Sequence, residues 1–194
     1  MAVRTVIEIG HKVLKLKNKT ISDFKSPKLK KLIQDLKDTM KQVDLIGIAA
    51  PQIGENYQVF LTHPRKTKAR RLGKSDKLRI FINPRITYQS SETSTIYEGC
   101  GCLPKQSIFG PVERAKEIEI EAYDEKGKLF TLRSDGILAR VILHEYDHLL
   151  GIEFVEKISD YRKLISWSLY STTIRNSRKQ QDASKISKIE FKKL

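Results

Sequence analysis

The segment His144-Glu145-Tyr146-Asp147-His148 has the residue types and spacing for metal-assisted hydrolysis. On a helix, His144 and His148 lie one turn apart on one face, so both imidazoles can reach a single metal ion. Glu145 is displaced around the helix axis, where its carboxylate can act on a metal-bound water instead of ligating the metal. The spacing therefore predicts two ligands and a general base on one helix.

Two histidines leave a metal site incomplete, and both cysteines of the chain, Cys100 and Cys102, lie in one short glycine-containing loop. A thiolate is a common zinc-type ligand, which favours a Cys-His-His site with one open position. Spacing does not decide which cysteine binds, because in an extended loop both side chains point to the same face. We expect His11 and His63 to have surface roles.

The helix that carries the two histidines is predicted from its own periodicity. Apolar residues recur at helical spacing from Ile137 to Leu149, and the helix is expected to begin at Ser134 or Asp135. This context favours a metal-binding helix over the alternative, which is a pair of ordinary histidines on a partly buried helix.

The surrounding elements indicate how the metal-binding segments are positioned. Helices are predicted to begin at Ser26-Pro27, as N-cap and first helical residue, and near Ser159. Residues 46–54 are interpreted as an edge strand or loop, and strands are predicted at 57–62, 78–82, 117–122 and 129–132, the last two as a hairpin. The pattern indicates an α+β fold, with partly antiparallel β-sheets packed around a central metal-binding helix and with a C-terminal helix. We expect a single catalytic domain over residues 1–175 and a basic tail, helical or disordered, over 176–194.

Composition limits the class of protein. The chain has 194 residues, 39% hydrophobic and 31% charged, which is typical of a folded protein that buries its own core. No apolar run approaches the roughly 20 residues of a membrane-spanning helix. The first residues lack a secretory signal, and two cysteines make no disulfide framework. These features favour a cytoplasmic location.

The formal net charge of +14 predicts an acidic partner, with nucleic acid ahead of an anionic membrane surface. Solubility alone is the alternative, and we expect no membrane partner. The basic loop over residues 63–79 is expected to be solvated, with nucleic-acid contact as the alternative. Oligomeric state is left open by the sequence.

Three ordered segments resemble the peptide deformylase family. They are Gly47-Ile48-Ala49-Ala50-Pro51-Gln52, Glu98-Gly99-Cys100 and His144-Glu145-Tyr146-Asp147-His148-Leu149. The resemblance covers about residues 2–160. It implies a hydrolase that removes the N-formyl group from the formylmethionine of nascent polypeptides and releases formate. It also implies one divalent ion, Fe²⁺ in the cell, with Zn²⁺ or Ni²⁺ as substitutes in purified protein.

By position, the resemblance implies a role for individual residues. The implied metal ligands are Cys100, His144 and His148. Glu145 is implied to be the general base and then the acid, while the Gln52 side-chain amide and the Gly101 backbone N–H are implied oxyanion donors. Residues implied to bind the peptide backbone are Ile46, Gly47 and Gly99. Residues implied to line the methionine pocket are Ile96, Ile137 and Val141.

The chain departs from the family pattern at a few positions. Leu45 replaces the first glycine of the first motif, and Gly101-Cys102 replaces the usual Leu-Ser. Arg140 stands where an apolar pocket residue is expected, which would alter the pocket if it faces inward. We also expect an ion pair between Arg114 and Asp147 that steadies the helix, or an ordinary salt bridge.

Other functions compete with the deformylase interpretation. A metallopeptidase would use the same ligands and base, and a catalytically idle relative would bind RNA or the ribosome instead. In the family, a basic C-terminal helix can contact ribosomal RNA, and the region from Arg162 to Lys193 carries the charge for this. Retention of Glu145 and Gln52 argues against the idle relative.

Overall fold

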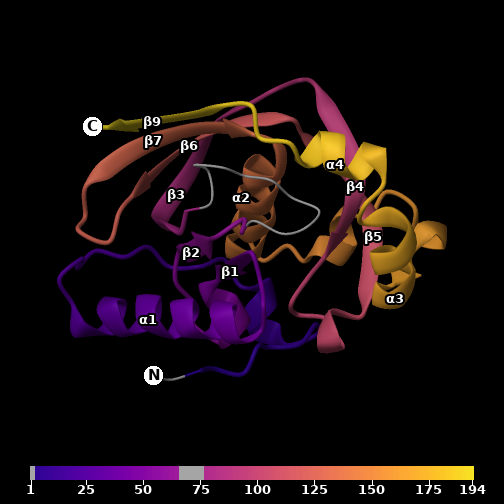
Figure 1. The fold of residues 1–194 in the computed structure, drawn as a ribbon. Helices are drawn as coiled ribbons and strands as arrows, with labels where there is room; N and C mark the ends of the chain where they lie inside the picture. The colour runs from indigo at the N-terminus through magenta and orange to yellow at the C-terminus, as the bar shows by residue number, and fades with distance from the viewer. Residues whose placement is uncertain (1–2, 66–76) are drawn as a thin grey trace.

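The computed structural model describes residues 3–65 and 77–194, which form two antiparallel sheets and several helices (Figure 1). One sheet has the strand order β1-β2-β3-β6-β7-β9 and the other the order β4-β5-β8. The strands of the first sheet are β1 (Gly47–Ala49), β2 (Val59–Thr62), β3 (Arg79–Gln89), β6 (Glu117–Tyr123), β7 (Leu129–Asp135) and β9 (Ile189–Lys193). Those of the second sheet are β4 (Thr93–Gly99), β5 (Ile108–Ala115) and β8 (Ile165–Ser166).

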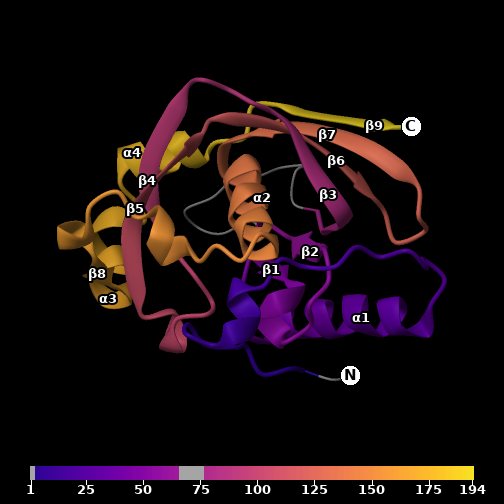
Figure 2. The ribbon, with the colours of Figure 1, turned by 180° about the vertical axis from the view of Figure 1, so that it is seen from behind.

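Helix α2 (Gly136–Leu149) lies in the middle of the molecule, with the larger sheet curving over it and β4 and β5 to one side (Figures 1 and 2). Leu138 and Ile142 of its apolar stripe are fully buried in the core shared with that sheet. Each such side chain contributes about 1.5–3 kcal/mol when buried, so the stripe holds the helix in place. The helix begins slightly later than expected because Ser134 and Asp135 still pair with β6.

Helix α1 (Pro27–Gln42) begins where the sequence predicts. The Ser26 hydroxyl accepts a hydrogen bond from the backbone N–H of Leu29 at 3.2 Å, which caps the helix. Its apolar stripe packs against β1 and β2, and the buried members are Leu29, Leu32, Ile33, Leu36 and Met40. This packing fixes the short edge strand β1 and the 3₁₀ turn over Ala50–Ile53 that follows it.

The predicted α+β architecture is confirmed, and the four predicted strands correspond to β2, β3, β6 and β7. The β4–β5 hairpin was not predicted. Its strands contain Gly99, Gly110 and Pro111, which weaken the strand signal, and they pair through Gly99 and Phe109 around the cysteine loop. In the basic loop predicted over 63–79, residues 66–76 lie outside the described part of the chain.

The C-terminal region differs from the expectation. Instead of a helix from Ser159, a 3₁₀ turn, strand β8 and the short helix α3 (Trp167–Leu169) follow one another, and α3 continues as a π-helical turn over Tyr170–Ile174. Helix α4 (Arg178–Ser184) agrees with a helical tail, but β9 then pairs with β7. The sequence did not reveal this strand, because all its side chains are exposed and it has no buried face to give a periodic apolar pattern. No helix in the described ranges is long and apolar enough to span a bilayer.

Candidate metal centre and substrate cleft

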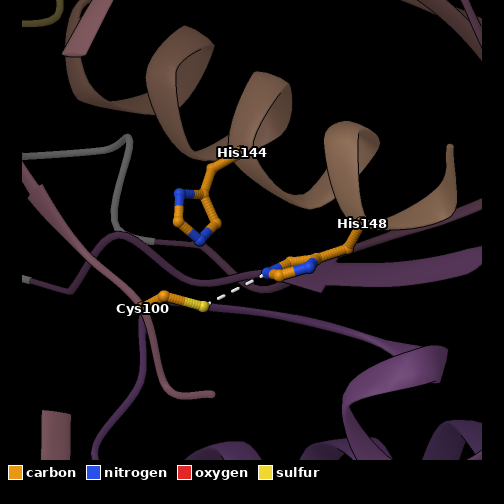
Figure 3. A group of neighbouring side chains, drawn as sticks. All are labelled: Cys100, His144 and His148. Carbon is orange, nitrogen blue, oxygen red and sulfur yellow. Dashed lines mark hydrogen bonds between the residues drawn. The ribbon is translucent and has the colours of Figure 1, made fainter. Parts of the chain in front are cut away.

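Cys100, His144 and His148 converge at one point. The cysteine follows directly after β4, and the two histidines project from one face of α2 toward it (Figure 3). One potential ligand atom from each residue lies within 4.8 Å of those of the other two, and the Cys100 Sγ is 3.3 Å from the His148 Nε2. Residue spacing left open which cysteine joins the histidines, whereas the family resemblance implied Cys100, and in the structure Cys100 is the cysteine grouped with both imidazoles.

The donor set and its surroundings fit a divalent metal ion. Burial and the neighbouring His144 hold the pKa of His148 well below its usual value, so this imidazole stays neutral, as a ligand must. A hydrogen bond with Cys102 and burial raise the pKa of the Cys100 thiol well above its usual value. A bound divalent cation opposes this shift, because it deprotonates a coordinating thiol. One thiolate with two imidazoles suits Fe²⁺ or Zn²⁺ and does not suit Mg²⁺.

Glu98 orients one of the two histidines. Its Oε2 lies 3.0 Å from the His144 Nδ1, so a proton on Nδ1 leaves Nε2 available to a metal. Arg114 donates to both carboxylate oxygens at 2.7 and 3.0 Å, and Arg140 donates to Oε1 at 2.6 Å. Burial raises the pKa of Glu98, but the charge of Arg114 and the bonds from His144 and Arg114 outweigh burial and hold this pKa well below its usual range. Glu98 is therefore an anion in the buried site.

The same network ties α2 to the smaller sheet. The expected ion pair between Arg114 and Asp147 is present at 2.8 Å. Arg140 is buried and bonds to the carbonyls of Ser94 and Val112 at 2.7 and 3.0 Å, in addition to Glu98. Sequence reasoning assigned no role to Glu98, although it is the first residue of the Glu-Gly-Cys motif. Its place two residues before Cys100, in the same motif, was the available sequence signal.

Glu145 lies at the same site with one carboxylate oxygen unsatisfied. It is 3% exposed, and Oε2 has no hydrogen-bond partner within the described residues. Burial, followed by the charge of Cys102, raises the pKa of Glu145 well above its usual value. Gly47 packs directly on this carboxylate, because a Cβ at that position would collide with the Glu145 Oε1 and with the Val141 Cγ1. The lack of a side chain at position 47 therefore leaves room for the Glu145 carboxylate.

Gln52 is held with its amide nitrogen toward the cysteines. The Gln52 Oε1 accepts a hydrogen bond from the Ala49 backbone N–H at 2.6 Å, and this fixes the orientation of the amide. Its Nε2 then lies 3.9 Å from the Cys100 Sγ and 3.6 Å from the Cys102 Sγ. The amide N–H₂ group is thus a donor aimed into the site.

A cavity of about 530 Å³ opens beside these groups. With the single exception of His148, every residue that sequence analysis assigned to the site lines it: Ile46, Gly47, Gln52, Ile96, Gly99, Cys100, Gly101, Ile137, Val141, His144 and Glu145. His148 is 1% exposed and reaches the cluster from behind the cavity wall. Sequence reasoning missed residues of the C-terminal region that also line the cavity, among them Trp167, Tyr170, Arg175 and Gln180.

Known proteins resemble this chain in sequence. The profile described as polypeptide deformylase matches residues 3–164. Peptide deformylase 2 of Clostridium perfringens is 39% identical over 165 residues, which span 85% of this chain and 99% of that protein. Peptide deformylase 1 of Bacillus subtilis is 38% identical over 162 residues, 83% of this chain and 93% of that protein.

Solved structures resemble it as well. A class I type b peptide deformylase from Acinetobacter baumannii, with bound Met-Ala-Ser, has a TM-score of 0.73 at 31% identity and covers 81% of this chain and 99% of its own. Peptide deformylase from Thermotoga maritima has a TM-score of 0.73 at 31% identity, over 82% of this chain and 100% of its own. The family-matched range, 3–164, contains the whole cysteine–histidine cluster and ends before β8.

Proposed function

Because this chain belongs to the polypeptide deformylase family, and is therefore a metal-dependent enzyme that removes N-formyl groups, we propose that Cys100, His144 and His148 hold its metal ion. The observation that carries this assignment is the convergence of their ligand atoms within 4.8 Å beside Glu145, whose Oε2 has no partner among the described residues. The family profile and the named relatives confirm the resemblance that the sequence motifs indicated. The substrate is the N-terminal formylmethionine of nascent polypeptides, and the products are formate and the free amine.

The three residues would hold one divalent ion, with Fe²⁺ as our proposal for the cell and Zn²⁺ or Ni²⁺ as replacements in purified protein. A thiolate ligand supports this choice over hard cations that prefer oxygen. When bound, the ion supplies a hydroxide near neutral pH and polarises the formyl carbonyl. Glu98 keeps the ring of His144 in the tautomer that presents Nε2.

Glu145 is the proton carrier of the proposed mechanism. Its carboxylate accepts a proton from the attacking water and then delivers it to the methionine nitrogen as the formyl C–N bond breaks. Burial raises the pKa of Glu145 above its usual value, which favours the carboxylate as the group that takes up the proton from water. The buried Oε2, which finds no hydrogen-bond partner in the described part of the chain, supports the assignment.

Gln52 and Gly101 would stabilise the developing oxyanion, Gln52 through its side-chain amide and Gly101 through its backbone N–H. Losing one such donor typically costs ~10²–10³ in rate. The Gln52 amide is already oriented by the Ala49 N–H, so little reorganisation is needed during the reaction.

The peptide would lie in the 530 Å³ cavity. Its backbone would pair with Ile46, Gly47 and Gly99, which belong to or flank edge strands of the two sheets. The methionine side chain would pack against the apolar part of the cavity wall that is formed by Ile96, Ile137 and Val141. The Met-Ala-Ser bound to the Acinetobacter baumannii relative supports a short peptide as the occupant.

The proposal is tested with formyl-Met-Ala-Ala and unformylated Met-Ala-Ala as parallel substrates for protein loaded with Fe²⁺ or Zn²⁺. We expect formate release from the first peptide and no cleavage of the second. Hydrolysis of an internal peptide bond would favour the metallopeptidase, and absence of turnover with a loaded site would favour the idle relative.

We predict that Glu145→Gln lowers kcat by about 10²–10⁴, because it removes the proton carrier. The metal content should stay equal to that of the wild type, since the three ligands are unchanged. Formate release and metal analysis of the same preparation measure both quantities. Near-normal turnover by the variant would remove Glu145 from the mechanism.

We further propose that the enzyme works in the cytoplasm on chains leaving the ribosome, and that its basic C-terminal region contacts ribosomal RNA. The net charge of +14 and the exposed lysines of α4 and β9 support this contact. Phosphate contacts of this kind make affinity fall with salt.

A further inference from the structure

One wall of the substrate cavity is built by residues beyond the family-matched range of 3–164. This C-terminal wall comprises Trp167, Tyr170, Arg175, Gln180, Gln181 and Ser184. In both ribbon views α3 and α4 stand next to β4 and β5, on the side of the molecule where the cysteine loop leaves β4 (Figures 1 and 2). Chain segments outside the family match therefore shape the space that the peptide enters.

Gln180 anchors this wall to the edge of β4. Its Oε1 accepts the Tyr97 backbone N–H at 3.1 Å and its Nε2 donates to the Tyr97 carbonyl at 2.9 Å, so the side chain occupies the place of a pairing strand. The Nε2 also lies 3.3 Å from the Tyr170 hydroxyl, and Gln180 is only 7% exposed. In an antiparallel pair, alternate residues present their N–H and C=O to the same edge. Gly99 therefore faces the same edge as Tyr97, and a peptide that pairs at Gly99 meets Gln180 at the next position.

Aromatic side chains stand directly beside Gly99. Atoms of the Phe109 ring lie 2.6 Å from the point where a Cβ on Gly99 would stand. Phe109 stacks on Tyr170 with ring centroids 4.1 Å apart, and the Trp167 ring is 5.5 Å from that of Phe109. Trp167 is 43% exposed, so part of this aromatic surface is open to a ligand. The guanidinium of Arg175 lies 5.5 Å from the centroid of the Trp167 ring, within the range of a cation–π contact.

We propose that Phe109, Trp167 and Tyr170 form a specificity-determining aromatic wall for the side chain that follows the methionine of the substrate. The proposal rests on the deformylase function and deepens it. An aromatic or large apolar side chain packs against the wall, because aromatic rings gain from offset and edge-on contacts beyond the burial of their area. Gln180 positions the wall by tying Tyr170 to the strand edge that receives the peptide.

The wall predicts a measurable substrate preference. For the wild-type enzyme we expect kcat/KM for formyl-Met-Phe-Ala to exceed that for formyl-Met-Ala-Ala by about tenfold, within the range that a hydrophobic pocket can discriminate. Trp167→Ala should lower this ratio to about two or three, because the loss falls more heavily on the phenylalanine peptide. Trp167→Phe should keep most of the preference.

Tyr161→Ala is the matched control. Tyr161 is an aromatic residue of the same region with 62% exposure, and it does not line the cavity. We expect this variant to keep both rates and their ratio. A third peptide, formyl-Met-Glu-Ala, tests whether the nearby Arg175 and Lys105 set the preference instead.

Three outcomes would overturn the aromatic wall: equal kcat/KM values for the phenylalanine and alanine peptides in the wild type, a glutamate peptide preferred to both, or a ratio unchanged by Trp167→Ala. The first two use only wild-type protein, so they hold even if a variant folds poorly. Failure of the deformylase function itself has a different signature, which is no formate from any of the three peptides.

Discussion

Glu98 is the residue on which the other groups of the site depend most. One carboxylate accepts hydrogen bonds from Arg114, Arg140 and His144 while it is only 8% exposed. Removing one partner from a buried charged network is far more costly than removing an exposed ion pair, because the remaining charges are left uncompensated. The same carboxylate also sets the tautomer of His144, a proposed metal ligand. Loss of the Glu98 carboxylate is therefore expected to affect both folding and metal binding.

We predict that Glu98→Gln lowers the free energy of unfolding by about 3–5 kcal/mol. Metal affinity should fall by about 10–100-fold, because the His144 ring loses the carboxylate that orients it. Urea unfolding and metal titration measure the two effects. Glu117→Gln is the control, since Glu117 also pairs with two cations, Arg133 and Lys188, but at the surface, and it should change little. Similar losses in both variants would contradict the special role of Glu98.

The acid dependence of stability gives an independent check on Glu98. Its folded-state pKa lies below the ordinary value, so its contribution to stability is present above the unfolded-state pKa of about 4.3 and is lost as pH falls through the folded-state pKa. The gap in unfolding free energy between the wild type and Glu98→Gln should therefore shrink below about pH 4. A gap that is constant from pH 7 to pH 3 would show that the carboxylate charge is not what stabilises the fold.

Leu45 and Gly101, two of the departures from the family pattern, contact one another. The Leu45 Cδ1 is 2.8 Å from the point where a Cβ on Gly101 would stand, so the leucine fills the space that a side chain at 101 would need. We predict that Gly101→Leu lowers kcat by about tenfold because the collision displaces the proposed oxyanion N–H. The double variant Leu45→Gly/Gly101→Leu should recover most of the rate, since contacting residues couple by about 0.5–3 kcal/mol. Additive losses in kcat would show that the two positions act separately.

At the scale of elements, the C-terminal region is part of the fold and is not a detachable tail. Strand β9 pairs with β7 over Phe130–Ser134, and Gln180 of α4 bonds to the edge of β4. Deletion of the residues after Arg175 is a simple way to test ribosome binding. In the structure this deletion removes a sheet strand and the anchor of the cavity wall, so it cannot separate binding from folding.

We predict that Gln180→Ala lowers the Tm by roughly 2–6 °C, because hydrogen bonds worth about 1 kcal/mol each are lost. The variant should also weaken the preference for formyl-Met-Phe-Ala over formyl-Met-Ala-Ala, which a purely stabilising residue would not alter. Gln34→Ala is the control, because Gln34 is exposed on α1, its side chain bonds to Asp38, and it does not line the cavity. If the Tm falls but the ratio of kcat/KM for the two peptides does not change, Gln180 stabilises the fold and does not influence substrate preference.

At the scale of the whole molecule, the effect of the net charge of +14 on ribosome binding depends on the positions of the lysines. Lys179 and Lys185 of the α4 region and Lys192 of β9 are exposed and offer a local patch for phosphate. Lys17, Lys30 and Lys41 are equally exposed, and Lys30 and Lys41 belong to or adjoin α1, which lies at the other end of the molecule from α4 (Figures 1 and 2). These two sets allow local contact to be distinguished from total charge.

We predict that changing Lys179, Lys185 and Lys192 to Glu weakens ribosome binding by about tenfold or more and flattens its dependence on salt. The same change at Lys17, Lys30 and Lys41 should have a smaller effect although the net charge is identical. Sedimentation with ribosomes at several salt concentrations measures both. Equal losses of ribosome affinity in the two triple variants would mean that the total positive charge of the protein drives binding, without a local contact by the C-terminal region.

The sequence by itself determined the local part of this site. Helical periodicity and the spacing of His144 and His148 place both imidazoles on one face, and Ser26 begins α1, because these relations involve residues within a turn of each other. The presence of the three motifs in the family's order then sufficed to predict the family. The same reasoning did not find the β4–β5 hairpin or strand β9, since their strands carry weak local signals and form through pairing with distant residues.

Only the tertiary structure decided the long-range relations. It joined Glu98 to Arg114 and Arg140, which stand far apart in sequence, and it brought Gln180 to the edge of β4 at Tyr97. Side chains of this kind have no periodic pattern, because their partners are chosen by the packing of sheets around α2. The pair of histidines is therefore readable from local spacing, whereas the position of Cys100 beside them, the charged network behind them and the proposed aromatic wall in front of them arise only when the chain is folded.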